Sequence, residues 1–179
     1  EVQLALRKFN KKPKAGVAYL FEHCALPRTP EAVADFLRTT RGLSKRRIGD
    51  YLGEPSDFHQ EVLAAYTRRF DFANLQFVEA VRSYLSPFRL PGEAQKIDRI
   101  MCTFSAHYVH QNPDVFASAD TAYVLAFAII MLNTDAHSPQ IRTKMSLDEF
   151  VRNNRGIDAG GDLPEQMLAN VYTDIVHCE

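Results

Sequence analysis

Hydrophobic residues recur at helical spacing along most of the chain. Val33, Phe36 and Leu37 follow one another at steps of three and one, and segments 97–108 and 167–176 repeat this kind of spacing over several turns. Apolar side chains placed in this way gather on one face of an α-helix. The apolar/polar alternation and hairpin dipeptides typical of strands are absent. The pattern therefore predicts an all-α protein.

Capping residues indicate where these helices begin and end. Thr29 before Pro30 is typical of an N-cap followed by proline at the first helical position. Ser146 with Glu149, and Asp162 with Glu165, each match the capping box. With the intervening turn residues, these signals predict ten helices, over residues 2–10, 14–24, 30–38, 44–52, 57–69, 74–86, 91–110, 120–137, 146–154 and 164–177.

Composition is consistent with one globular domain. The chain has 179 residues, of which 46% are hydrophobic and 24% charged, so a disordered protein is excluded. Its longest apolar stretch, 122–132, is too short to cross a membrane. The three cysteines are far apart, which argues against a disulfide framework and favours a reducing compartment. Cys102 falls within an amphipathic helix and is expected in the core.

The net charge of -1 conceals an uneven distribution. Residues 1–47 hold 11 of the 21 Lys and Arg residues and only 4 of the 22 Asp and Glu residues. A basic surface of this kind can attract acidic lipids or nucleic acid, but the simpler interpretation is a solvated helical face.

Several common chemistries have no motif here. The sequence lacks the phosphate-binding pattern GxxxxGK[ST], and it contains no HExxH, CxxC or GxSxG. His107 and His110 stand three residues apart, but no third metal ligand lies near them in the sequence. We therefore expect no bound metal and no cofactor.

The first stretch that calls for a functional explanation is 88–99, which reads FRLPGEAQKIDR. Pro91 is expected to open a helix, which places Glu93 in the first turn. An acidic residue there complements the helix dipole in many proteins. Gly92, however, removes a side chain next to the carboxylate. Glu93 is therefore expected at a bare corner, from which it could reach into another molecule's site.

The second stretch, 120–139, contains the most apolar helix of the chain. Two interpretations stay open: a core helix buried on every side, or a helix that faces the core on one side and lines an apolar groove on another. Tyr123, Phe127, Ile130 and Met131 share one stripe, and aromatic and methionine side chains are enriched at protein interfaces. The polar end, 133–137, is unusual for a core helix and favours a site.

Together, these two stretches resemble the signature motifs of the Sec-seven domain, the exchange unit of guanine-nucleotide exchange factors for Arf GTPases. The resemblance covers about residues 7–175, includes segments 48–53 and 154–164, and within the family is closest in appearance to the cytohesins. It implies an elongated right-handed superhelix of about ten helices with an apolar groove. The implied organisation is a single domain over 1–179, with two helical lobes that meet near residues 60–75.

The resemblance also implies which residues act. Glu93 matches the family's "glutamic finger". The implied partner contacts lie in the turn that supports the finger, along the groove and on its polar rim: Pro91, Gly92, Gln95, Asp120, Tyr123, Phe127, Ala128, Ile130, Met131, Asn133, Asp135, Ser138 and Met145. Ser138 stands where many members carry Asn, so one hydrogen bond of the rim is expected to differ.

The function implied by the resemblance is the release of GDP from an Arf-family GTPase, without covalent chemistry, cofactor or nucleic acid. The expected partner is the GDP-bound and then the nucleotide-free GTPase, and the chain is expected to work as a monomer. The implied location is the cytoplasm, at the periphery of Golgi, endosomal or plasma membranes, where the basic segment could meet an acidic lipid surface.

Two alternatives to exchange stay open. A helical interaction scaffold would bind a partner through Phe127 and Met131 without using Glu93. Residues 7–47 could instead bind lipid or nucleic acid through charge, with an affinity that falls steeply with salt.

The inhibitor brefeldin A gives the resemblance a second consequence. In this family the inhibitor traps the complex near the helix 120–137. Phe127-Ala128 resemble insensitive members, which replace a Tyr-Ser pair, whereas Asp135 and Met145 resemble sensitive ones. On balance, the sequence favours resistance.

Overall fold

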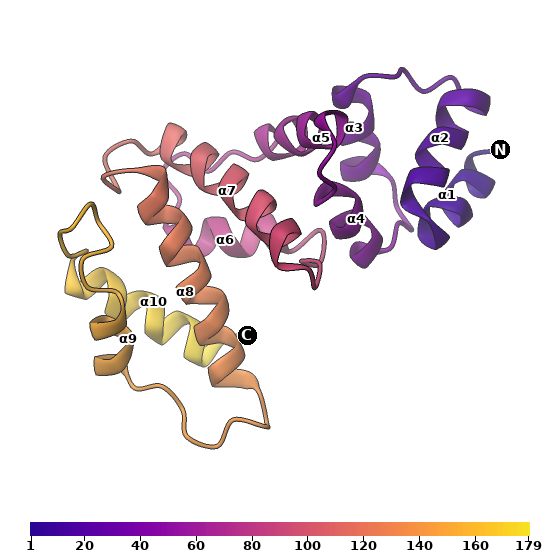
Figure 1. Ribbon diagram of the computed structural model, residues 1–179. Coiled ribbons are helices and arrows are strands. Elements are labelled where there is room, and N and C mark those ends of the chain that lie inside the picture. Colours follow the sequence, from indigo (N-terminus) through magenta and orange to yellow (C-terminus); the bar gives the residue numbers. More distant parts are fainter. The chain divides into compact units, whose positions relative to one another are not determined.

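The computed structural model describes residues 1–179 and contains ten α-helices and no β-strand, with one isolated bridge between Asp158 and Gly161. The helices are α1 (Val2–Lys11), α2 (Pro13–His23), α3 (Pro30–Thr39), α4 (Lys45–Leu52), α5 (Asp57–Arg68), α6 (Phe77–Leu85), α7 (Ala94–Gln111), α8 (Ala119–His137), α9 (Leu147–Asn153) and α10 (Glu165–His177). The all-α class and the ten helices are confirmed (Figure 1).

Two helices begin three residues later than the sequence pattern predicts. Asn74 has a φ of 61°, in the left-handed region, which a right-handed helix cannot accommodate, so α6 begins at Phe77 instead of 74. Pro91 does not open α7, because the helix begins at Ala94. The carbonyl of Glu93 accepts the first helical hydrogen bonds, from the amides of Lys96 and Ile97 at 3.1 Å. Glu93 therefore occupies the N-cap position rather than the first turn.

The capping predictions have mixed outcomes. The capping box of Ser146 and Glu149 is confirmed, with the Ser146 amide 2.8 Å from Glu149 Oε2 and the Glu149 amide 3.2 Å from Ser146 Oγ. The predicted box of Asp162 and Glu165 is wrong. Asp162 Oδ1 instead accepts the amide of Gly156 at 2.8 Å, which closes the loop before α10.

The chain divides into two compact units. The first comprises residues 1–71 and 82–104, and the second comprises residues 72–81 and 105–179. Both α6 and α7 therefore contribute residues to each unit. The idea that the protein works as two lobes meeting near residues 60–75 stays a prediction.

The core of the first unit holds one end of the 88–99 stretch in place. Within this unit α1 packs on α2, α3 packs on α5, and α4 packs on both α2 and α5. Phe88 is buried, and its ring centroid lies 6.0 Å from that of Tyr66 and 5.5 Å from that of Tyr84. Tyr84 and Thr67 share a buried hydrogen bond of 2.8 Å between their hydroxyl oxygens. The segment that leads to Glu93 is thus anchored by an aromatic cluster.

Helix α8 is buried on one side only, although its sequence is apolar nearly all round. Its buried side chains are Thr121, Ala122, Leu125, Ala126, Ile129 and Leu132, and α10 packs against both α8 and α9 in the second unit (Figure 1). The other side carries half-buried and exposed apolar residues. Of the two interpretations of this helix, the structure therefore supports a core face combined with a free apolar face. None of the ten helices has the length and apolar character required to cross a bilayer.

The prediction that Cys102 lies in the core is wrong, because its side chain is exposed on α7. The buried stripe of this helix passes through Ile100, Met101 and Phe104. Successive residues of an α-helix are turned by about 100°, which places Cys102 beside this stripe rather than on it.

Candidate functional site

Glu93 projects from an exposed corner between a short loop and α7. Its side chain is 75% exposed, and the nearest positive charge, Lys96 Nζ, lies 3.9 Å from Glu93 Oε1. A Cβ atom built on the preceding Gly92 would meet no atom within 4 Å. Internal packing therefore does not require glycine at this position. The bare, approachable corner expected from the sequence is present, one residue before the helix.

The loop that carries Glu93 is fastened to the first unit by the residues that precede Glu93. Phe88 and Pro91 are both buried. The amide of Arg89 donates to the carbonyl of Lys45 at 3.1 Å, and Lys45 Nζ donates to the carbonyl of Ser86 at 2.9 Å. These bonds tie the loop to the first turn of α4. The exposed carboxylate thus stands on a fixed backbone.

Gly49 of α4 and Gly53, which caps the end of this helix, make the attachment possible. A Cβ atom on Gly49 would lie 1.8 Å from the carbonyl oxygen of Arg89, and one on Gly53 would lie 2.7 Å from Cβ of Lys96. Real side chains do not approach so closely, so only glycine lets the loop and α7 lie against this helix. The sequence pattern alone predicts no role for these residues. Two glycines four residues apart on one helix face were the available signal for a close contact.

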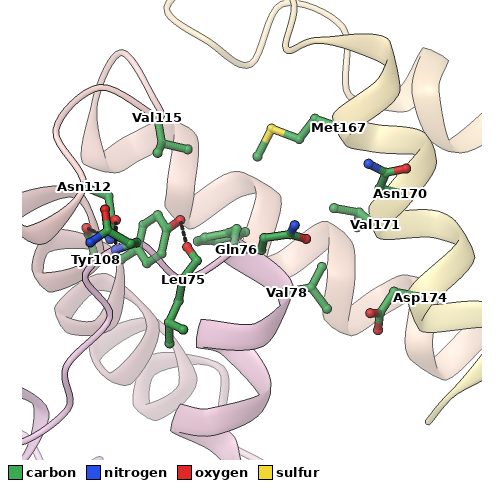
Figure 2. A pocket seen from close by; sticks show the side chains of 12 residues that line it. Leu75, Gln76, Val78, Tyr108, Asn112, Val115, Met167, Asn170, Val171 and Asp174 are labelled. Carbon is green, nitrogen blue, oxygen red and sulfur yellow. Dashed lines mark hydrogen bonds between the residues drawn. The ribbon is translucent and has the colours of Figure 1, made fainter.

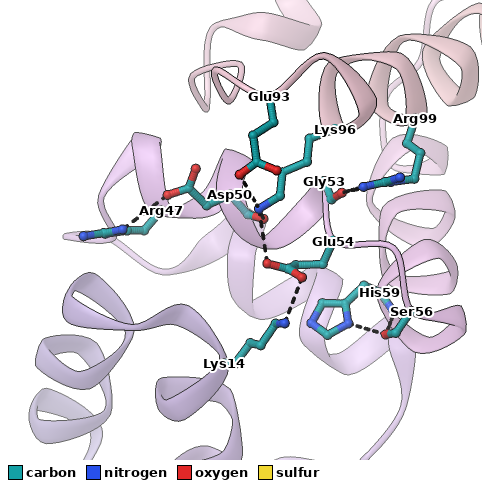
Figure 3. Close-up of polar contacts among 10 residues, drawn as sticks. All are labelled: Lys14, Arg47, Asp50, Gly53, Glu54, Ser56, His59, Glu93, Lys96 and Arg99. Atoms are coloured by element: carbon teal, nitrogen blue, oxygen red, sulfur yellow. Dashed lines mark hydrogen bonds and ion pairs between the residues drawn. The ribbon is translucent and has the colours of Figure 1, made fainter.

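A chain of charges lies below Glu93 (Figure 3). Lys96 Nζ lies 3.2 Å from Glu54 Oε1 and 3.4 Å from the carbonyl oxygen of Asp50, and Lys14 Nζ lies 2.8 Å from Glu54 Oε2. Burial opposes ionisation of Glu54, but the hydrogen bonds from Lys14 and Lys96 prevail and lower the pKa of its carboxyl group. Glu54 is therefore ionised at neutral pH and holds both lysines, of which Lys96 lies beside Glu93.

The second part of the candidate site is an apolar groove in the second unit. It is a cavity of about 520 Å³ between α8, Met145 and α9, lined by Tyr123, Val124, Phe127, Ala128, Met131, Met145, Phe150, Asn153 and Asn154. Met131 is 65% exposed and Val124 is 40% exposed. Exposed apolar side chains around a hollow are typical of a protein-binding surface. The groove is open rather than filled by the chain's own residues.

The edge of the groove is held by the polar end of α8. Asp135 Oδ2 accepts the amide of Met145 at 2.7 Å, and the hydroxyl of Tyr172 donates to the carbonyl of Met145 at 2.8 Å. Lys144 Nζ donates to the carbonyls of Asp135 and Ser138 at 2.8 and 2.7 Å. Within the polar end that stood out in the sequence, Asp135 therefore serves to fix Met145 beside α8.

The structure brings most of the predicted groove residues together. Tyr123, Phe127, Ala128, Met131 and Met145 line the groove. Ile130 is half-buried and is not among the lining residues, because it lies on the far flank of the stripe. The remaining predicted contacts are distributed as follows: Gln95 is exposed on the first turn of α7, Asp120 is exposed at the start of α8, and Asn133 and Ser138 are half-buried at its end.

Four groove residues were missed by the sequence analysis. Val124 belongs to the apolar helix already singled out, and the 100° step from Tyr123 was a signal that it borders the same hollow. Phe150, Asn153 and Asn154 come from α9 and the residue after it, more than twenty residues along the chain. No periodicity in the sequence indicates that α9 lies next to α8. Only the structure therefore shows that α9 forms this wall of the groove.

A further cavity of about 480 Å³ lies elsewhere in the second unit, between the start of α6, the end of α7 and α10 (Figure 2). The Tyr108 hydroxyl donates to the carbonyl of Leu75 at 2.8 Å. Asn112 Nδ2 donates to the carbonyl of Phe72 at 2.9 Å, and its Oδ1 accepts the amide of Asn74 at 2.9 Å. These bonds fasten the segment before α6 to α7. They give Tyr108 and Asn112 a structural role, and we assign the cavity no ligand.

An exposed carboxylate on an anchored loop and an open apolar groove are features of a protein-binding surface. The comparison with known families makes this specific. The family model of the Sec7 domain matches residues 1–179, and the chain belongs to this family. The resemblance drawn from the sequence is thereby confirmed.

Relatives of two kinds are about equally similar to the chain. It is 51% identical over 179 residues to Brefeldin A-inhibited guanine nucleotide-exchange protein 2 of Arabidopsis thaliana, covering 100% of the chain and 10% of that protein. It is 50% identical over 175 residues to Cytohesin-3 of Rattus norvegicus, covering 98% of the chain and 44% of that protein. The chain thus spans between about a tenth and less than half of the length of these relatives.

Solved structures give the same family. The Sec7p catalytic domain matches with a TM-score of 0.93 and 47% identity, over 99% of this chain and 94% of that one. A structure of ARF1-GDP bound to a Sec7 domain complexed with brefeldin A matches with a TM-score of 0.91 and 38% identity, over 100% and 91% of the two chains.

Proposed function

We propose that this chain is a guanine-nucleotide exchange factor that promotes the release of GDP from an Arf-family GTPase. The observation that carries the proposal is the exposed Glu93 on its anchored loop, in a chain that belongs to the Sec7 domain family. The names of its relatives, which are guanine nucleotide-exchange proteins and cytohesins, support the same activity. The structural neighbour that binds ARF1-GDP supports the choice of GTPase.

In this proposal, exchange begins with binding of the GTPase to the apolar groove. Its lining, with Phe127 and Met131 at the centre, binds the switch regions of the GTPase most tightly in a displaced conformation. Only a difference in affinity between the two conformations can shift the equilibrium of the GTPase. Displacement of the switch regions opens the metal side of the nucleotide site. The proposed rim contacts are Asp120, Asn133, Asp135 and Ser138, and Ile130 supports the groove from its flank.

Glu93 acts in the second step of exchange. Its carboxylate enters the opened site close to the β-phosphate of GDP, where it crowds the position of Mg²⁺ and offers the phosphate-loop lysine of the GTPase another partner. Two like charges about 4 Å apart repel one another by roughly 4 kcal/mol at an effective dielectric constant of about 20. An energy of this size corresponds to roughly a thousandfold faster release. Pro91, Gly92 and Gln95 shape the corner that the GTPase meets, and the exchange makes no covalent bond.

The direct test is the release of fluorescent GDP from a panel of Arf and Arf-like GTPases. We expect acceleration of release from at least one Arf protein by catalytic amounts of the 179-residue chain. No acceleration with any Arf protein, by a chain that circular dichroism shows to be folded, would contradict the proposal.

Replacing Met131 by Asp separates exchange from simple folding effects. Because Met131 is 65% exposed, a carboxylate there costs the free protein little. In a complex it would be buried unpaired, so we expect affinity for Arf to fall about 30-fold or more. The measurement is the Arf concentration that gives half-maximal release. Leu147→Asp is a matched control, since Leu147 is also an exposed apolar residue but does not line the groove.

The same substitution bears on the alternative of an interaction scaffold without exchange activity. In a scaffold, Met131→Asp weakens partner binding, whereas substitutions at Glu93 leave partner binding unchanged. If an Arf protein binds the chain while its GDP release is unaffected by either the wild type or a Glu93 variant, the scaffold is the better description.

Brefeldin A provides a separate prediction. Phe127 and Ala128 both line the groove, and they resemble the pair found in insensitive members of the family. We expect exchange by the wild-type chain to resist the inhibitor, and the double variant Phe127→Tyr with Ala128→Ser to become sensitive. A titration of brefeldin A into the exchange assay checks both. Strong inhibition of the wild type at low inhibitor concentration would count against this assignment.

We further propose that the chain acts as a monomer in the cytoplasm, at the periphery of Golgi, endosomal or plasma membranes. The basic character of residues 1–47 supports contact with an acidic lipid surface.

A further inference from the structure

A cavity of about 580 Å³ lies beside Glu93 in the first unit, and its wall is rich in positive charge. The cations come from the junction of α1 and α2, the start of α4 and the first turn of α7: Lys11, Lys12, Lys14, Arg46, Arg47 and Lys96. Three acids, Asp50, Glu54 and Glu93, share the wall. The lining therefore has an excess of three positive charges.

The internal ion pairs leave part of this charge free. Arg47 Nη1 pairs with Asp50 Oδ2 at 3.3 Å, and Glu54 holds both Lys14 and Lys96. Lys11, Lys12 and Arg46 are exposed, and their side chains make no ion pair or hydrogen bond within the chain. Three unpaired cations at the mouth of a concave site indicate an anionic ligand with more than one negative charge.

The lining residues also indicate which chemical class of anion the cavity binds. The only aromatic residue of the wall is Tyr51, which is 2% exposed and so presents no ring face to a ligand. A single-stranded nucleic acid would find phosphate contacts here but no surface for base stacking. The size of the cavity is within the range of about 300–1,000 Å³ that is usual for small-molecule sites. A phosphorylated headgroup without a base fits both observations.

Helix α1 indicates that this headgroup belongs to a membrane. Leu4 is 46% exposed and lies seven residues before Lys11, so the two side chains share one face of α1. Arg7 and Lys8, three and four residues after Leu4, border the same face and are exposed. An exposed leucine among basic residues is typical of a helix that rests at a membrane interface.

From these observations we infer that the cavity binds the phosphorylated headgroup of an anionic membrane lipid, with Leu4 resting in the bilayer surface. Lys11, Lys12 and Arg46 contact the phosphates. The inference rests on the proposed function in one respect: the role of Glu93 in exchange is taken from that proposal, and the same residue lies at the edge of the lipid-binding site. Glu93 and a bound phosphate repel one another, so removing the negative charge of Glu93 strengthens lipid binding.

The test is sedimentation of the 179-residue chain with vesicles of phosphatidylcholine that contain phosphatidylinositol bisphosphate. Vesicles of equal total charge made with phosphatidylserine serve as the comparison. We expect tighter binding to the phosphoinositide vesicles. Each basic residue near an anionic surface contributes roughly a fivefold factor, so Lys11→Gln, Lys12→Gln and Arg46→Gln together are expected to weaken binding by roughly 100-fold. The matched control neutralises three exposed arginines outside the cavity, Arg68, Arg152 and Arg155.

Two further variants complete the design. Leu4→Ser is expected to weaken binding to vesicles but not to soluble inositol trisphosphate, whereas Glu93→Gln is expected to bind the phosphoinositide vesicles more tightly than the wild type. Equal binding to both kinds of vesicle, or equal loss in the two triple variants, would overturn the proposal in favour of diffuse charge attraction. Vesicle binding no tighter than binding of soluble inositol trisphosphate would overturn the membrane assignment. So would tighter binding of an oligonucleotide than of the phosphoinositide vesicles at the same salt concentration.

The outcome can be separated from that of the exchange proposal. GDP release from an Arf protein in solution, without vesicles, is expected to be the same for the cavity triple variant and the wild type. A chain that exchanges nucleotide but ignores phosphoinositides contradicts only the lipid site. A chain that binds phosphoinositides but exchanges no nucleotide contradicts only the proposed function.

Discussion

The substitution Glu93→Lys is expected to lower the rate of GDP release by at least about a thousandfold, because it removes a repulsion of roughly 4 kcal/mol and places a positive charge near the phosphate instead. The stability of the free protein is expected to stay nearly the same. The side chain is 75% exposed, and its one charged neighbour, Lys96, lies 3.9 Å away. An exposed pair of this kind contributes about 1 kcal/mol or less to stability. The loss is therefore expected in exchange and not in folding.

Single-turnover release of fluorescent GDP from Arf measures the effect, and the thermal unfolding midpoint is the control. We expect the variant to keep a wild-type midpoint and to form a complex with Arf from which GDP leaves slowly. Glu79→Lys is a useful comparison, since Glu79 is another exposed acid at the start of a helix. A Glu93→Lys variant that retains most of the wild-type exchange rate would remove Glu93 from the mechanism.

The sequence was a good guide to the helices because most of them are amphipathic and end at recognisable caps. The capping box at Ser146 and the N-cap at Thr29 are local features, since each depends on residues within one turn. The errors arose where a distant contact decides the local structure. Asp162 is drawn away from α10 by the amide of Gly156, and Asn74 takes a left-handed conformation in a segment that is fastened to Asn112.

The candidate site was only partly accessible to the same reasoning. Glu93 and the stripe from Tyr123 to Met131 could be selected because they are unusual within their own segments. The wall that α9 adds to the groove could not, because it depends on how α8, α9 and α10 pack in the second unit. The contact of Gly49 with Arg89 joins positions forty residues apart. A sequence pattern records the glycine, but only the fold shows what the glycine makes room for.

Gly49→Ala is expected to destabilise the first unit strongly. Its Cβ would lie 1.8 Å from the carbonyl oxygen of Arg89, and both groups belong to backbone that cannot rotate away. Either α4 or the loop must move, at a cost of roughly 3 kcal/mol, the upper end of the range for overpacking. The hydrogen bond between the Arg89 amide and the Lys45 carbonyl would be strained as well. We therefore expect a lower free energy of unfolding in urea and a displaced Glu93.

Gly92→Ala is the matched control for this substitution, because it adds the same methyl group to a glycine of the loop itself, two residues before α7 begins. Since nothing lies within 4 Å of the new atom, the free energy of unfolding is expected to change by less than about 0.5 kcal/mol. Exchange is nevertheless expected to fall about tenfold or more, because the added methyl group obstructs the approach of the GTPase to Glu93. The two variants thus separate a glycine that the fold requires from one that the partner requires. If Gly92→Ala exchanges nucleotide at the wild-type rate, the bare corner beside Glu93 is not a contact surface. If Gly49→Ala is as stable as the wild type, the loop is not held by α4 in the way described.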